Sequence, residues 1–100
     1  MSSPADELVS EKRFQAELVR VLELTGWRVY HTYDSRRSAP GFPDLVCLKG
    51  QRLLALEVKS ATGRVTPDQR AWLQALSIIP GVSAYVVRPA PDLRELVAIL

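Results

Sequence analysis

Two carboxylates and a lysine lie at the ends of two short apolar runs in the middle of the chain. Asp44 opens the run 45–48, and Glu57 and Lys59 end the run 53–59. If the turn between the runs forms a hairpin, Asp44 lies beside Glu57. Side chains alternate along a strand, so Glu57 and Lys59 share one face. Two like charges about 4 Å apart repel by roughly 4 kcal/mol at an effective dielectric constant near 20.

A divalent cation between the two carboxylates would turn that repulsion into attraction. Oxygen ligands suit magnesium or manganese, and a lysine nearby can orient a water molecule or stabilise a developing anion. The residues alone leave an alternative open, because short patterns of this kind recur by chance. In that alternative the chain forms a surface hairpin that ends in a solvated glutamate–lysine pair.

A helix is predicted over 10–25, with Ser10 as its N-cap. Glu11 and Gln15 fall on its otherwise apolar inward face, at about 100° per residue. Two interpretations of these polar side chains remain. Either the first turn is exposed, with Glu11 favoured there by the helix dipole, or both side chains lie over the predicted metal site.

The alternation of β-branched and aromatic residues over 27–33 predicts a strand. His31 in this strand could carry a proton, although packing or solvation is the commoner role of a single histidine. The polar loop 34–41 follows and contains Arg36 and Arg37. Guanidinium groups suit phosphate oxygens, and the alternative for two adjacent arginines is plain solvation.

Thr66 begins a second predicted helix as its cap, and Pro80 and Gly81 end it. Gln69 completes a capping box, and it could also reach a substrate or bound water. A strand over 82–88 and a short closing helix to the last residue complete an αβββαβα order. This order predicts an α/β fold with a mixed central sheet flanked by helices.

Composition bounds the class of protein. One hundred residues, 47% hydrophobic and 24% charged, predict one globular domain over 1–100, with 1–9 as a flexible N-terminal arm. A net charge of +2 requires any nucleic-acid contact to come from a local basic patch. The single Cys47 excludes an internal disulfide and a cysteine-based zinc site. No apolar run has transmembrane length, so we expect a cytoplasmic protein without membrane contact.

Several motifs in this order resemble the VRR-NUC domain, in its short stand-alone phage and bacterial form, within the PD-(D/E)XK (restriction-endonuclease-like) nuclease superfamily. They are the Glu11/Gln15 helix, Gly41-Phe42-Pro43-Asp44, Glu57-Val58-Lys59, Gly63-Arg64 and Thr66-Pro67-Asp68-Gln69. Their joint occurrence is more specific than the acidic residues and lysine alone. The resemblance covers nearly the whole chain.

The resemblance implies a restriction-endonuclease-like core and a phosphodiesterase that uses Mg²⁺ or Mn²⁺ and no organic cofactor. It implies metal ligands at Asp44, Glu57, the Val58 carbonyl and Glu11, a catalytic Lys59, and supporting roles for Glu11, Gln15 and Gln69. The predicted DNA contacts are Arg36, Arg37, Ser38 and Arg64. The resemblance further implies a DNA endonuclease for branched, flapped or four-way (Holliday) junctions that acts as a homodimer.

Two alternatives to a structure-specific nuclease remain. One is a restriction-type or RNA-directed nuclease on the same core, and the other is a DNA-binding module without catalysis. The acidic residues argue against the second alternative, because a binding module would gain nothing from repelling phosphates at that place.

Overall fold

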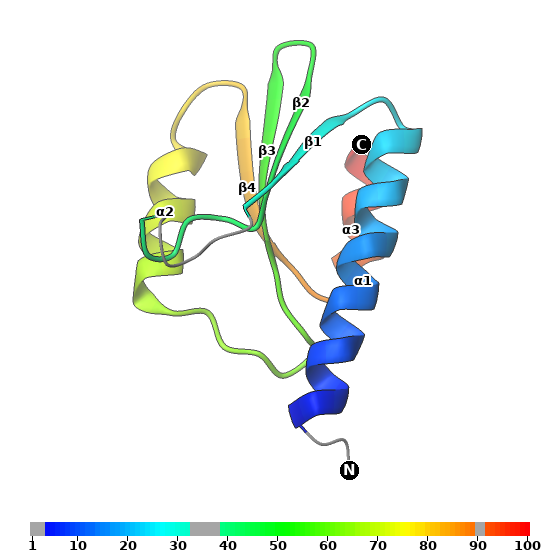
Figure 1. The fold of residues 1–100 in the computed structure, drawn as a ribbon. Helices are drawn as coiled ribbons and strands as arrows, with labels where there is room; N and C mark the ends of the chain where they lie inside the picture. Colours follow the sequence, from blue (N-terminus) through cyan, green and yellow to red (C-terminus); the bar gives the residue numbers. More distant parts are fainter. Residues whose placement is uncertain (1–3, 33–38, 90–91) are drawn as a thin grey trace.

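The computed structural model describes residues 4–32, 39–89 and 92–100, with side chains from residue 11 onward. Along the chain the elements are α1 (Pro4–Leu24), β1 (Arg28–His31), β2 (Leu45–Lys49), β3 (Arg52–Val58), α2 (Pro67–Ser77), β4 (Val82–Val87) and α3 (Asp92–Ile99). Figure 1 shows this arrangement. The αβββαβα order confirms the predicted fold class.

The four strands form one mixed sheet in the order β1-β2-β3-β4. Strand β2 pairs antiparallel with both β1 and β3, whereas β3 and β4 are parallel. Parallel neighbours need a crossover connection, and α2 supplies it between β3 and β4. The β2–β3 pair is the hairpin predicted from the sequence, with Leu45 opposite Leu56.

Helices cover the two faces of the sheet unequally. Helices α1 and α3 lie on one face, and α2 lies on the other (Figure 1). The core is on the α1/α3 side and consists of Phe14, Leu18, Leu22, Trp27, Leu45, Cys47, Leu54, Leu56, Val58, Val87 and Leu96. By contrast, none of the α2 side chains, all of which the structure describes, is fully buried. The α2 face can therefore accommodate polar and charged side chains between the helix and the sheet.

Helix α1 begins earlier than predicted. It starts at Pro4, so Ser10 lies inside the helix and is not its N-cap. Residues 4–9 are helical in backbone, where the sequence predicted part of a flexible arm. The reason is that proline favours the first helical turn, and neither glycine nor another proline interrupts the segment from there to Ser10. The preference of serine for the N-cap position therefore did not start the helix at Ser10, because the preceding residues can all continue it.

The turn between β2 and β3 is attached to the ends of two helices. Lys49 Nζ donates a hydrogen bond to the Thr25 carbonyl at 2.7 Å, and Arg52 Nη2 donates to the Ile99 carbonyl at 3.0 Å. Both cations also lie over the Trp27 ring. These contacts hold the end of the sheet that is farther from Asp44 and Glu57. In the part of the chain that the structure describes, no helix is long and apolar enough to cross a membrane.

Candidate active site

The antiparallel register of β2 and β3 brings the two carboxylates together. Leu45 pairs with Leu56, so the preceding Asp44 lies opposite Glu57. Asp44 Oδ2 accepts a hydrogen bond from the Val58 amide at 2.8 Å, which attaches the Asp44 side chain directly to β3. Side-chain alternation places Leu56 and Val58 in the core and turns Glu57 toward α2.

Glu57 is almost completely buried, with 2% of its surface exposed. Its Oε1 accepts a hydrogen bond from Gln69 Nε2 at 3.0 Å and lies 3.5 Å from Lys59 Nζ. Its Oε2 is buried and has no hydrogen-bond partner among the described residues. A buried polar atom without a partner is destabilising and calls for an explanation. The two oxygens of Glu57 therefore have different environments.

Burial raises the pKa of Glu57 from its ordinary value of 4.5 to about 8. The negative charge of Asp44 and hydrogen bonding between the two carboxyl groups also raise this pKa, and Lys59 opposes them. Two ionised carboxylates have no hydrogen to donate, so Oε2 stays unsatisfied in that state. Either a proton or a cation between the two groups would satisfy it.

The donor set fits a divalent metal. Asp44 and Glu57 supply hard oxygen ligands on adjacent strands, and Glu57 Oε2 is unused. No group of three histidine, cysteine, aspartate or glutamate side chains gathers anywhere in the described ranges. Magnesium commonly binds one or two carboxylates and completes its shell with waters and substrate phosphates, so two carboxylates suffice. The predicted contribution of the Val58 carbonyl stays a prediction.

Gln69 lies where the sequence placed it, at the start of α2, and its side chain makes two contacts. Its Oε1 accepts from the Thr66 amide at 2.9 Å, and Thr66 Oγ1 accepts from the Gln69 amide at 3.2 Å. The predicted capping box is therefore confirmed. Because Oε1 is held by the cap, Nε2 is the end that points to Glu57. The sequence treated capping and site contact as separate roles, whereas one amide performs both.

Gln15 and His31 contact each other. Gln15 Nε2 lies 3.2 Å from His31 Nδ1, and the register of β1 with β2 places His31 opposite Leu45. Both side chains are thus on the α1 face, whereas Glu57 faces α2. Glu11 is half-buried on α1, and it does not form a three-residue group with Asp44 and Glu57 in the described chain. Site roles for Glu11 and Gln15 stay predictions.

Of the predicted DNA contacts, only Arg64 lies among the described residues. Arg64 is exposed in the connection between β3 and α2. Arg36, Arg37 and Ser38 lie outside the described residues. Their contact with DNA stays a prediction.

Two supporting residues, Thr32 and Trp72, were missed from the sequence. Thr32 donates from its amide to the Asp44 carbonyl at 2.9 Å and from its hydroxyl to the Pro43 carbonyl at 2.8 Å. Trp72 of α2 donates from Nε1 to the Pro40 carbonyl at 3.1 Å. These contacts hold the last two residues of the Gly-Phe-Pro-Asp motif and the residue just before it. The two proline carbonyls could have drawn attention as acceptors, but nothing local identifies their donors.

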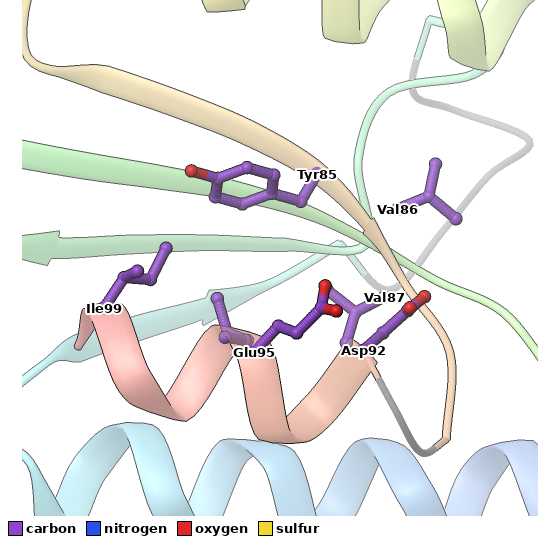
Figure 2. Close-up of a pocket in the computed structure, with 7 residues that line it drawn as sticks. Tyr85, Val86, Val87, Asp92, Glu95 and Ile99 are labelled. Carbon is purple, nitrogen blue, oxygen red and sulfur yellow. The ribbon is translucent and has the colours of Figure 1, made fainter.

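A cleft of about 280 Å³ lies elsewhere, between β4 and α3. Figure 2 shows that Tyr85, Val87, Asp92, Glu95 and Ile99 line it. Asp92 Oδ2 accepts a hydrogen bond from the Arg88 amide at 3.1 Å. The cleft is on the helix α3 side of the sheet, and neither of its carboxylates resembles Glu57, because Asp92 accepts a hydrogen bond from the Arg88 amide and Glu95 is exposed. The Asp44–Glu57 pair is therefore the better candidate for chemistry on nucleic acid.

Comparisons with known proteins identify the family of the chain and a solved structure of similar fold. A solved structure of Hjc, a Holliday junction resolvase from the archaeal hyperthermophile Archaeoglobus fulgidus, superposes with a TM-score of 0.61 and 28% sequence identity. The match covers 79% of this chain and 67% of the Hjc chain. No curated protein matches. The VRR-NUC domain model matches residues 5–90, and the chain therefore belongs to the VRR-NUC family.

Proposed function

We propose that this chain is a metal-dependent endonuclease that hydrolyses phosphodiester bonds in branched DNA. The single observation that carries the proposal is the buried Glu57 beside Asp44, with one carboxylate oxygen held and the other without a partner. A divalent cation would satisfy this second oxygen and would also remove the repulsion between the two ionised carboxylates. Membership in the VRR-NUC family supports a nuclease.

Each residue around the pair has a defined task in this proposal. Asp44 and Glu57 would hold Mg²⁺ or Mn²⁺, which supplies a Lewis acid and a more acidic water when bound. Val58 and Gln69 each hold one carboxylate oxygen by a hydrogen bond, which leaves the remaining oxygens oriented away from these donors. Lys59 is 15% exposed, and its Nζ lies 3.5 Å from Glu57 Oε1. Its ammonium group can stabilise the negative charge that develops on the phosphate in the transition state.

The similarity to a Holliday junction resolvase supports branched or four-way-junction DNA as the substrate. We also propose a homodimer, because a two-fold axis would present two active sites to two strands. Arg36, Arg37, Ser38 and Arg64 are the proposed contacts to the DNA backbone. Their guanidinium and hydroxyl groups would bind phosphates and leave base recognition unspecified.

A substrate panel tests the proposal. End-labelled DNA four-way junctions, flaps, hairpins and linear duplexes, together with RNA of matched sequence, are incubated with Mg²⁺ or Mn²⁺, and a parallel series contains chelator. We expect cleavage of branched substrates, weak cleavage of the duplex and none in chelator. Cleavage that persists in chelator would refute the metal assignment. Equal rates on duplex and junction, or faster cleavage of matched RNA, would favour the restriction-type or RNA-directed alternatives.

A further inference from the structure

We propose that Gly41 is a positioning residue that acts through Gln69 on Glu57. This inference rests on the proposed function, in which Glu57 holds a divalent metal. The loop that carries Gly41 leads directly into Asp44, whereas Gln69 belongs to α2 and binds the carboxylate that faces Asp44. The loop would therefore set the place of the helix that holds the second ligand.

The backbone at Gly41 lies against the first turn of α2 with no room for a side chain. A Cβ at this position would lie 2.5 Å from both the Asp68 carbonyl carbon and the Gln69 nitrogen. It would also lie 2.7 Å from Asp68 Cβ. The φ angle of +83° is a second reason for glycine. The obstructing atoms are mostly helix backbone, so a larger residue must displace the helix or the loop.

The residues next to Gly41 on both sides also contact α2. Trp72 Nε1 donates to the Pro40 carbonyl at 3.1 Å, and the Phe42 and Trp72 rings meet edge-to-face with centroids 5.1 Å apart. Contacts on both sides of Gly41 thus hold the loop on one helix face. They give the helix start a defined place relative to Asp44.

The consequence for Glu57 follows from the distances. Non-bonded carbon atoms prefer a separation of about 3.5–4.0 Å, so an added Cβ requires a displacement of roughly 1 Å. The Gln69–Glu57 hydrogen bond is 3.0 Å long, and a lengthening of that size abolishes it. The capping box prevents compensation, because Gln69 Oε1 is already bound to Thr66. Glu57 Oε1 would then keep only Lys59 nearby.

Three glycine variants separate this effect from general destabilisation. Gly41→Ala tests the loop–helix contact. Gly81→Ala is the matched control, because Gly81 has a similar φ of +82° and its Cβ would lie 2.7 Å from the Gln51 carbonyl oxygen, near the β2–β3 turn. Gly50→Ala controls for the backbone conformation alone, because Gly50 has a φ of +59° and nothing within 4 Å.

The first measurement uses metal-free protein. We expect Gly41→Ala to move the Gln69 side-chain amide resonances in an ¹⁵N-correlated NMR spectrum toward those of a solvated glutamine, and both control variants to leave them in place. Trp72→Phe is a milder second variant that keeps a smaller aromatic ring beside Phe42 and removes the indole N–H donor. It should shift the same resonances less, and it provides the test if Gly41→Ala does not fold.

The second measurement is Mn²⁺ affinity by calorimetric titration. Loss of a hydrogen-bond partner of a ligand typically weakens metal binding by about 10- to 100-fold, and we expect this for Gly41→Ala and for Gln69→Ala. Because Gly41 acts through Gln69, the double variant should lose no more than either single variant. If the two losses add, if Gly81→Ala matches Gly41→Ala, or if Gly41→Ala changes neither resonances nor affinity, the proposal is wrong. A wild-type protein that binds Mn²⁺ but cuts no DNA would refute the proposed function while leaving Gly41 testable.

Discussion

Two pairs of acidic side chains in this molecule look alike in composition and differ in physical state. Asp44 and Glu57 face each other across β2 and β3, and Glu57 is buried with a pKa raised by burial to about 8. Asp92 and Glu95 lie in the first turn of α3 and line the cleft between β4 and α3. In the second pair, Glu95 is exposed and Asp92 binds the Arg88 amide.

The comparison shows that a count of carboxylates does not identify a metal site. Adjacent strands force Asp44 and Glu57 together and exclude the water that would otherwise screen their repulsion. At the cleft, solvent screens Glu95, and the Asp92 side chain already satisfies a backbone amide. Of the two pairs, only Asp44 and the buried Glu57 thus have a mutual repulsion that a cation can relieve. The predictions below test this difference from the largest expected effect to the smallest.

Glu57→Gln and Asp44→Asn should each reduce the cleavage rate by more than about a thousandfold, because a metal ligand and its charge are lost. Glu95→Gln should stay within about twofold of wild type. The measurement is single-turnover cleavage of a labelled four-way junction in Mg²⁺, with folding checked by circular dichroism. A Glu57→Gln protein that cuts at the wild-type rate would show that the buried pair is not the active site.

Lys59→Met should reduce the rate by about a hundred- to thousandfold, as expected for one lost transition-state donor. Its melting temperature should stay near the wild type, and it should still bind junction DNA in Ca²⁺. Lys49→Met should instead lower the melting temperature and leave the cleavage rate near that of the wild type. The hydrogen bond from Lys49 to the Thr25 carbonyl contributes about 0.5–1.5 kcal/mol of stability, and it lies far from the carboxylates. If Lys59→Met instead loses the roughly 3–5 kcal/mol typical of a broken buried ion pair, the lysine has a structural role.

The pH dependence of stability should differ between the two acidic pairs. The pKa of Glu57 is higher in the folded protein, about 8 against 4.5, so the unfolded chain releases this proton first. The unfolding free energy of metal-free protein should therefore fall as pH rises from about 4.5 to about 8. Denaturant titrations at several pH values should show this fall in wild type and Glu95→Gln, and a weaker fall in Glu57→Gln. Equal slopes in all three would contradict the pKa shift.

Arg64→Ala should weaken binding to junction DNA modestly without abolishing cleavage. Loss of one phosphate contact should flatten the dependence of log affinity on log salt by somewhat under one unit. The Arg36→Ala/Arg37→Ala double variant should flatten it by up to twice as much. Arg94→Ala, at an exposed position of α3 outside the predicted DNA contacts, should leave the slope unchanged. Fluorescence anisotropy with junction DNA in Ca²⁺ measures all four proteins, and an unchanged slope for Arg64→Ala would assign that residue to plain solvation.

Much of the site was predictable because its geometry is local. The alternation of a strand and the short turn between two apolar runs were enough to place Asp44 beside Glu57 and Lys59 on the same face as Glu57. The capping box at Thr66 and Gln69 depends on residues three apart and was also predicted. Such patterns can be recognised from sequence because the interacting residues are joined by one strand, turn or helix.

The remaining features depend on how distant segments pack. The sequence alone determined the element order, the hairpin and the identity of the acidic pair. Only the tertiary structure decided that Gln15 contacts His31, that Gly41 lies against the start of α2, and that one oxygen of Glu57 is held while the other has no partner. The physical reason is that burial and steric exclusion act between surfaces that meet only after folding. The secondary-structure preferences of a loop's own residues do not specify which surface the loop will contact.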